Sequence, residues 1–289
     1  MNYEVFLGDC IPHMHEMQPE SVDFAIFSPP FPALFAYTAE AADLGNSESF
    51  AGDAKLHLMW FTRALAPLIK PGRCVIVHVQ NIAAVKRTGD LSTTDLRGLM
   101  IRLGKRAGLI YETDWAITKN PQSQAIRTRS RKLQFAGLES DRAQSAPAFS
   151  DYLIKFRAAG ENAVPIVHEG LTRQEWIDWA EGAWTWREIR ETDTLNTKAA
   201  KSGDDTRHIC PLQLGAINRC IRLYSNPGEL VFSPFTGIGS EGYEAVRLGR
   251  RFYGCEIKPE YHAQALKNLA RAEQQEEMQL ALFAGEVSR

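Results

Sequence analysis

The chain has 289 residues, of which 44% are hydrophobic and 24% charged, and its formal net charge is −2. These ordinary values exclude a disordered, a collagen-like or a strongly basic protein, and the length provides for a sizeable core. The start, MNYEVFLGDC, lacks the basic and apolar regions of a secretory signal, and no apolar run is long enough to span a bilayer. We therefore expect a cytoplasmic protein without a membrane partner.

The five cysteines form no CxxC pair, which favours reduced, mostly buried thiols over disulfides. A zinc site needs clustered ligands, and the nearest candidate, His13-Met14-His15, has no cysteine close to it in the sequence. We therefore expect that the protein holds no metal ion.

Seven segments are rich in β-branched and aromatic residues and are expected to form strands. They are Tyr3–Leu7, Val22–Phe27, Cys74–Gln80, Ile110–Thr118, Tyr152–Phe156, Glu229–Phe235 and Arg251–Ile257. Helical patterns lie between or after them, over Asp53–Ile69, Leu91–Ala107, Leu212–Tyr224, Tyr243–Gly249 and Glu260–Leu282. Runs such as VDFAIF are apolar at consecutive positions, which suits strands buried on both faces. The alternation predicts an α/β fold with a doubly wound, mostly parallel seven-stranded sheet, and Lys70-Pro71-Gly72 is expected to end the first of these helices.

The small net charge conceals a strong pattern along the chain. Residues 1–60 hold nine acids and one base, residues 86–142 hold twelve bases and six acids, and residues 161–205 hold ten acids and five bases. The run 119–132, KNPQSQAIRTRSRK, has five bases, no acid and few large apolar residues. That composition is typical of a loop that lies on phosphates, although a solvated face is the simpler alternative.

The region 158–207 interrupts the alternation and contains four of the six tryptophans, Trp176, Trp179, Trp184 and Trp186, without a good strand pattern. One interpretation is a small helical insert whose tryptophans pack on the main domain. The other is a recognition element that presents aromatic and polar side chains to a partner.

The buried strand VDFAIF is followed directly by Ser28-Pro29-Pro30-Phe31. Two prolines stiffen the backbone and remove two N–H donors, so carbonyls and the Ser28 hydroxyl are left as acceptors beside the flat face of Phe31. An acceptor pair next to an aromatic plate suits a planar ring that carries an exocyclic amine. The acceptors hold the amine protons and turn the nitrogen lone pair toward an electrophile. An ordinary Pro-Pro strand end is the alternative.

Residues 229–242, ELVFSPFTGIGSEG, lead from a strand into Gly237-x-Gly239-x-x-Gly242, and Glu256 ends the next expected strand. Glycines let the backbone approach a ligand closely, and a carboxylate at this place accepts from two sugar hydroxyls. The pattern fits an adenosine cofactor of any kind, so NAD and S-adenosylmethionine both stay open. A dehydrogenase usually begins with this unit, whereas this chain ends with it.

Together, these two features resemble the exocyclic-amino DNA methyltransferases of the permuted class, in which the catalytic motif precedes the cofactor motif. VDFAIFSPPF, FSPFTGIGSEG and GCEIKPEYHAQA are similar to the catalytic, methionine-binding and ribose-binding blocks of that family, and the resemblance covers most of the chain. Ser233 is a departure, because the cofactor block of the family usually starts Asp-Pro-Phe.

The resemblance implies a Rossmann-like, site-specific DNA methyltransferase that uses S-adenosylmethionine on a flipped base in duplex DNA, and it suggests a homodimer. The target amine, adenine N6 or cytosine N4, stays open. The implied catalytic residues are Ser28, Pro29, Pro30 and Phe31. The implied cofactor-binding residues are Asp9, His208, Pro211, Leu212, Ser233, Phe235, Thr236, Gly237, Gly239 and Glu256. The residues expected to contact DNA are Lys119, Arg127, Arg129, Arg131 and Lys132.

The expected organisation is a catalytic half, 1–157, a target-recognition insert, 158–207, and a cofactor-binding half, 208–289, of one methyltransferase domain. Two other functions stay open. The first is a methyltransferase that acts on an RNA base or a protein amide, in which the four-residue motif usually follows the cofactor block. The second is an NAD-dependent dehydrogenase, which leaves SPPF unexplained.

Overall fold

The computed structural model describes residues 2–30, 52–82, 93–128, 135–167, 170–197 and 212–287. The described strands are β1 (Tyr3–Leu7), β2 (Val22–Phe27), β3 (Ile69–Gln80), β4 (Ile110–Ile117), β5 (Asp151–Arg157), β6 (Ala183–Trp184), β7 (Leu230–Ser233) and β8 (Arg251–Glu256). The described helices are α1 (Cys10–Glu16), α2 (Asp53–Leu65), α3 (Leu96–Arg106), α4 (Pro121–Thr128), α5 (Phe135–Glu139), α6 (Arg173–Trp179), α7 (Leu214–Tyr224), α8 (Ser240–Arg247) and α9 (Pro259–Val287).

The strands form one eight-stranded sheet in the order β1-β8-β7-β2-β3-β5-β4-β6. Strand β5 runs antiparallel to β3 and β4, and the other neighbouring pairs are parallel. The doubly wound, mostly parallel α/β fold is thus confirmed. The eighth strand, β6, has only two residues, which pair with the end of β4, and such a short strand leaves no pattern in the sequence.

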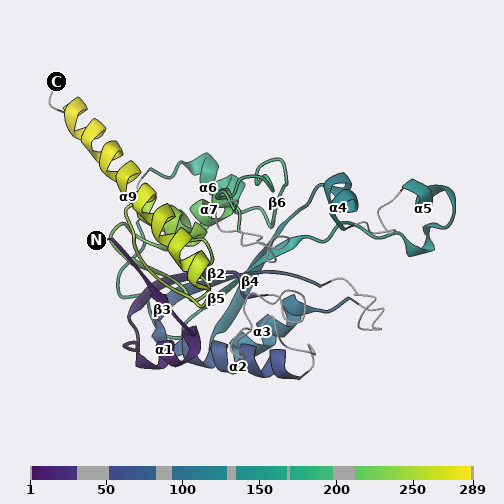
Figure 1. The fold of residues 1–289 in the computed structure, drawn as a ribbon, viewed down its shortest axis with the longest axis horizontal. Coiled ribbons are helices and arrows are strands. Elements are labelled where there is room, and N and C mark those ends of the chain that lie inside the picture. Colours follow the sequence, from purple (N-terminus) through teal and green to yellow (C-terminus); the bar gives the residue numbers. More distant parts are fainter. Residues whose placement is uncertain are drawn as a thin grey trace.

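Helices cover both faces of the sheet because its central strands are apolar on both sides (Figure 1). All six residues of β2 are buried. Phe24 and Ile26 belong to the hydrophobic cluster that includes α7 and α8, whereas Ala25 and Phe27 belong to the cluster that includes α1, α2 and α3. Successive side chains of a strand point to opposite faces, so consecutive apolarity gives two cores.

Lys70-Pro71-Gly72 does not end a helix, contrary to the expectation. Helix α2 ends at Leu65, a 3-10 turn, η2 (Ala66–Leu68), follows, and β3 begins at Ile69. The pairing of β2 with β3 shifts register between Val22 and Phe24, so an irregularity in the ladder accommodates Pro71 and Gly72 within the strand.

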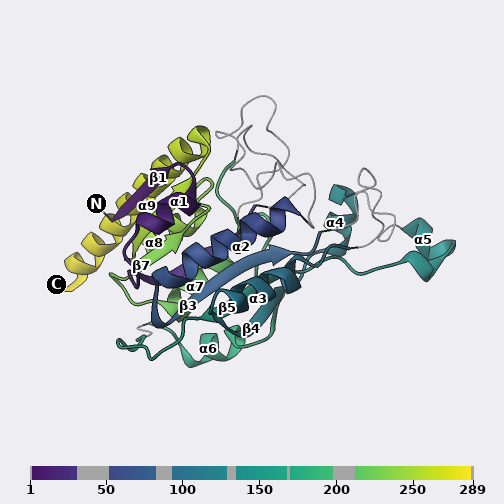
Figure 2. The same cartoon turned by 90° about the horizontal axis from the view of Figure 1, so that it is seen from below.

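The basic run 119–132 is not all loop, since α4 lies within it. The side chain of Asn120 accepts from the backbone N–H of Gln122 at 2.9 Å, and Pro121 is the first helical residue. A capping asparagine followed by proline is a helix start signal, whereas the basic and polar composition of the run indicated a loop. Together α4 and α5 form an arm, residues 118–128 and 135–150, which projects from the body at the end opposite to the tip of α9 (Figures 1 and 2).

Cys10, Cys74, Cys220 and Cys255 are buried and form no disulfide, as expected, and Cys210 lies outside the described residues. Burial raises the pKa of Cys220 and of Cys255 to about 12, so both stay protonated thiols. Within the described ranges, no helix is long and apolar enough to cross a membrane, and no group of three or more His, Cys, Asp or Glu residues could hold a metal ion.

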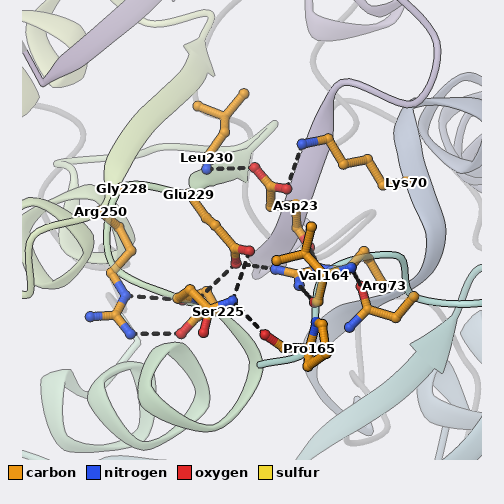
Figure 3. Close-up of polar contacts among 12 residues, drawn as sticks. Asp23, Lys70, Arg73, Val164, Pro165, Ser225, Gly228, Glu229, Leu230 and Arg250 are labelled. Atoms are coloured by element: carbon orange, nitrogen blue, oxygen red, sulfur yellow. Dashed lines mark hydrogen bonds and ion pairs between the residues drawn. The ribbon is translucent and has the colours of Figure 1, made fainter. Parts of the chain in front are cut away.

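A buried polar network ties the start of the region 158–207 to the amino-terminal ends of the central strands (Figure 3). The Arg73 guanidinium donates to the backbone oxygen of Asp23 at 2.9 Å and to that of Val164 at 3.4 Å, and it pairs with the Glu229 carboxylate. Glu229 in turn accepts from the backbone N–H of Asn226 at 2.7 Å. The region therefore begins at the amino-terminal edge of the sheet.

Further along, Trp179 and Trp184 are buried in the core that includes α7. The guanidinium of Arg219 lies 4.9 Å from the Trp184 ring centroid and 5.5 Å from that of Trp179. Trp176 is 54% exposed and Trp186 is half-buried. Two of the four tryptophans thus pack on the main domain, as the simpler interpretation expects.

Candidate active site

The predicted site residues gather at one edge of the sheet. Strands β1, β8, β7 and β2 are consecutive and parallel, so their carboxyl ends lie side by side. Asp9 follows β1, Glu256 ends β8, Ser233 ends β7 and Ser28 follows β2. Ligands of doubly wound folds bind at this edge, where connections leave toward opposite sides of the sheet.

The glycine-rich turn between β7 and α8 is shaped by backbone hydrogen bonds to β8. Thr236 N–H donates to Cys255 O at 2.9 Å, and Gly237 N–H donates to Glu256 Oε2 at 2.7 Å. Gly237 has φ +55°, and no heavy atom lies within 4 Å of where a Cβ would stand. Gly239, with φ +88°, is the N-cap of α8. The turn is therefore open beside Gly237, where a ligand can approach the backbone.

Glu256 is held rigidly at the end of β8. Its Oε1 accepts from Lys258 N–H at 2.8 Å while Oε2 accepts from Gly237 N–H. A carboxylate offers about four acceptor positions, so it can accept from ligand hydroxyls as well as from these amides.

Asp9 lies next to Glu256. Its Oδ1 accepts from Ile11 N–H at 2.9 Å and so caps α1, and the preceding Gly8 N–H donates to Glu256 O at 2.9 Å. The two carboxylates predicted to hold the cofactor are thus anchored on adjacent strand ends.

The remaining predicted cofactor residues differ in their surroundings. The half-buried Phe235 packs on Phe61 with ring centroids 4.8 Å apart, beside the glycine-rich turn. Leu212 is buried in the core, before α7. His208 and Pro211 lie outside the described residues.

Buried polar atoms around the turn fit a bound polar ligand. The hydroxyls of Ser233 and Ser240 are buried and have no hydrogen-bond partner within the described part of the chain. Buried polar atoms are normally satisfied, so a ligand or a water is expected to bind them. Burial also raises the pKa of Glu241, in the first turn of α8, to about 8, so this acid is mostly uncharged at neutral pH.

The Ser28-Pro29-Pro30 segment directly follows β2, the strand next to β7, and Phe31 is outside the described residues. Pro29 is buried, and Ser28 and Pro30 are half-buried. Ser28 Oγ lies 2.8 Å from His78 Nδ1 and 3.3 Å from His78 O. Ser28 is therefore a surface-reaching hydroxyl with a histidine directly behind it.

A buried carboxylate, Asp151, lies behind the histidine. His78 Nε2 is 3.2 Å from Asp151 Oδ2, in an electrostatic contact rather than a hydrogen bond, and Lys119 forms an ion pair with the same oxygen. Gln80 donates to Asp151 Oδ1 at 3.0 Å. Burial acts to raise the pKa of Asp151, but its contacts with His78 and Lys119 hold it below the ordinary value. Asp151 is therefore ionised at neutral pH.

Comparison with known proteins decides the family. A sequence profile described as DNA methylase, of the N6/N4 type, matches residues 22–267. The chain belongs to this DNA methylase family. The resemblance inferred from the catalytic and glycine-rich motifs is thereby confirmed.

This DNA methylase family member matches individual relatives over shorter stretches of sequence. It is 38% identical over 82 residues to the type II methyltransferase M1.MboII of Moraxella bovis, which is 28% of this chain and 30% of that one. It is 42% identical over 53 residues, 18% of each chain, to the DNA adenine methyltransferase YhdJ of Escherichia coli K12. In these alignments the chain spans less than a third of the length of either relative.

Two solved structures share the fold over nearly the whole chain. A DNA modification methylase of Thermus thermophilus, in complex with S-adenosyl-L-methionine, superposes with a TM-score of 0.68 at 18% identity, covering 94% of this chain and 96% of that one. The cytosine-N4-specific PvuII DNA methyltransferase gives a TM-score of 0.66 at 18% identity, covering 93% and 86%.

The structure describes only some of the residues that are expected to bind DNA. Lys119 does not point to solvent, because only 7% of its side chain is exposed and it pairs with Asp151. The expectation of a phosphate contact by Lys119 is therefore not supported by its position. Arg127 lies on α4, in the projecting arm, and Arg129, Arg131 and Lys132 lie outside the described residues.

His78 and Asp151 were not among the residues selected from the sequence. Neither belongs to a motif: His78 lies inside a segment predicted as a strand from its β-branched and aromatic residues, and Asp151 directly precedes another such segment, although β5 includes it. A polar residue at a buried strand position is the signal that could have found them.

Proposed function

We propose that the protein transfers a methyl group from S-adenosylmethionine to the exocyclic amine of adenine or cytosine in duplex DNA. A base inside a duplex cannot reach the methyl group, so the target nucleotide leaves the stack. The observation that carries the proposal is the position of Ser28-Pro29-Pro30 and of the glycine-rich turn at the carboxyl ends of adjacent strands, β2 and β7. A base held at the first site is next to a cofactor held at the second.

The cofactor residues divide between two ends of the ligand. Asp9 and Glu256 hold the adenosine, and Glu256 accepts from the ribose hydroxyls. The methionine part is held by the turn, through Ser233, Phe235, Thr236, Gly237 and Gly239, and by residues that precede α7 in the sequence, His208, Pro211 and Leu212. When bound, S-adenosylmethionine supplies an electrophilic methyl group.

The base residues position the amine. Ser28 Oγ and the Pro29 carbonyl accept from the two amine protons, and Phe31 stacks on the ring. This turns the nitrogen lone pair toward the methyl group, and orientation of this kind removes much of the entropic barrier. No covalent nucleophile is needed.

We propose that part of the insert 158–207 contributes to base reading. Its start lies at the amino-terminal edge, but Trp184 pairs with Ile117 at the carboxyl end of β4, which is the same edge of the sheet as the proposed active site. We propose that residues 183–197, from β6 onward, face the DNA together with the arm. We also propose a homodimer that acts on DNA in the cytoplasm.

Incubation with radiolabelled S-adenosylmethionine and plasmid DNA, RNA or protein tests this function. We expect the label on DNA, and a Phe31→Ala variant should lose most of it because the stacking partner of the flipped base is gone. Label on RNA or on protein amides instead, or NADH binding without S-adenosylmethionine binding, contradicts the proposal.

Changing Arg127, Arg129 and Arg131 together to glutamine should weaken binding to all DNA sequences. If each arginine neutralises one phosphate, the slope of log K against log salt falls by about 3 in magnitude. Titrations at several salt concentrations measure that slope.

The matched control changes Arg102, Lys105 and Arg106, which are exposed near the end of α3, before β4 begins. It removes the same charge from the same basic segment but at the amino-terminal edge of the sheet, so the slope should stay unchanged. An equal fall in both variants, or altered sequence preference at constant slope in the first, contradicts phosphate contact by the arm.

A further inference from the structure

A row of polar side chains runs from Ser28 into the interior of the protein. It passes through His78 and Asp151 and ends at Lys119. The exposed fraction of the side chain is 9% for His78 and 7% for both Asp151 and Lys119, whereas Ser28 is half-buried. The row therefore reaches the surface at Ser28, which is where the proposed target amine binds.

The register of the sheet fixes this row. Phe27 pairs with Val77 across β2 and β3, so the next residues, Ser28 and His78, lie side by side on the opposite face from that pair. Asp151 pairs with Gln80 across β3 and β5, and His78 is the diagonal neighbour of Asp151 on the same face. The backbone thus holds the row in place.

Lys119 joins the row from the neighbouring strand. Asp151 also pairs with Ile117 across β5 and β4, and Lys119, two residues beyond Ile117, returns to the same face. Its ammonium and the amide of Gln80 each bind one carboxylate oxygen. These two contacts orient Asp151 so that Oδ2, the oxygen paired with Lys119, also faces His78 Nε2.

The carboxylate sets which ring nitrogen of His78 carries the proton. Because Asp151 is ionised and lies 3.2 Å from Nε2, the proton belongs on Nε2, and Nδ1 is then an acceptor. The Ser28 hydroxyl therefore donates to Nδ1 across 2.8 Å. Its lone pairs are left to accept from a ligand amine.

We propose that His78 is a positioning residue that acts through Ser28 and receives the proton released by the methylated amine. This proposal rests on the proposed function. The amine nitrogen uses its lone pair to form the bond to the methyl carbon, while the carbon–sulfur bond breaks and its electron pair stays on sulfur. The nitrogen, now positively charged, releases one proton to Ser28 Oγ, and the Ser28 hydroxyl proton moves to His78 Nδ1.

The positive charge thus ends on the His78 imidazole, opposite the Asp151 carboxylate. Within the described part of the chain, the charged groups that face His78 are Asp151 from β5 and Lys119 after β4. Ser28 and Gln80 are neutral. The proton then leaves to solvent after the product base withdraws from Ser28.

Single-turnover methyl transfer, measured against pH, tests the proposal with His78→Gln and Asp151→Asn variants. We expect both to lower the rate on the order of 10²-fold, which is the effect typical of losing a positioned base. The dissociation constant for S-adenosylmethionine and the KM for DNA should change less than about threefold, because neither residue touches a ligand. If the wild-type rate falls toward acidic pH because a proton already occupies His78, that fall should be absent in His78→Gln.

Two controls separate this role from a structural one. His15→Gln, an exposed histidine of α1, should keep the wild-type rate and profile. Asp151→Asn conserves shape, so it reports on the proposal even if His78→Gln does not fold. Nitrogen-15 NMR of histidine-labelled wild-type protein should show the Nε2–H tautomer for His78, and this readout does not depend on activity.

Failure of the role proposed for His78 and failure of the proposed function give different results. If wild-type protein methylates DNA and both variants keep its rate, proton transfer through Ser28 to His78 is wrong while the proposed function stands. An Nδ1–H tautomer of His78 contradicts this proton transfer as well. If wild-type protein transfers no label to DNA, the proposed function is wrong, and so is the proton transfer to His78.

Discussion

Replacing Glu256 by alanine should weaken S-adenosylmethionine binding about 10³-fold. Two ribose hydroxyls lose a charged acceptor, and hydrogen bonds to charged groups contribute roughly 1.5–3 kcal/mol each, so the loss is about 4 kcal/mol. The variant also frees the Gly237 N–H, which now donates to Oε2 at 2.7 Å and holds the turn in shape. Isothermal titration calorimetry measures the affinity. Glu256→Gln keeps one acceptor oxygen and should lose less.

Glu260→Ala is the matched control for this experiment. Glu260 is exposed in the first turn of α9, four residues after Glu256. It should bind S-adenosylmethionine as the wild-type protein does. Unchanged affinity in Glu256→Ala, with the wild-type thermal stability retained, contradicts the assignment of Glu256 to the ribose.

Replacing Arg73 by methionine should cost about 3–5 kcal/mol of unfolding free energy, because removing one partner of a buried ion pair leaves the other uncompensated. Only 2% of the Arg73 side chain is exposed, and its partner Glu229 is 13% exposed. Arg73 also binds the backbone oxygens of Asp23 and Val164 (Figure 3). Urea unfolding, with its midpoint and slope, measures the effect.

Arg251→Met controls for loss of an arginine near the same network. Arg251 is exposed and donates to Gly228 O at 3.0 Å, so its loss should cost less than about 1 kcal/mol. Equal destabilisation by the two variants would show that the buried pair with Glu229 contributes no more to the unfolding free energy than the exposed contact of Arg251. Folded Arg73→Met should still bind S-adenosylmethionine, because Arg73 lies at the opposite edge of the sheet from Glu256.

The parts of the fold that the sequence predicted are those with a local physical signal. The run VDFAIF is apolar at every position but one, and β2 has the predicted bounds. Strand β6 and the continuation of β3 through Pro71 and Gly72 were missed, because both depend on pairing with a neighbouring strand rather than on residue type. Local propensity carries no information about such pairing.

The candidate site follows the same rule. Ser28 and Gly237 were selected because prolines and glycines constrain the backbone within one segment, and Glu256 because it ends the next strand after the glycines. His78 and Asp151 are 73 residues apart in the sequence (151 − 78), and only the register of β3 against β5 brings them together. Lys119 was interpreted from its basic neighbours, whereas its position next to Asp151 gives it a buried partner.

The most direct measurement of the central claim is modification-sensitive sequencing of plasmid DNA from cells that express the protein. The claim is that a base held at Ser28-Pro29-Pro30 reacts with a cofactor held at the turn of Gly237. We expect N6-methyladenine or N4-methylcytosine at one recurring sequence, absent from cells that express Ser28→Ala. Unmodified DNA in the presence of folded protein that binds S-adenosylmethionine, or methylation only at cytosine C5, would contradict it.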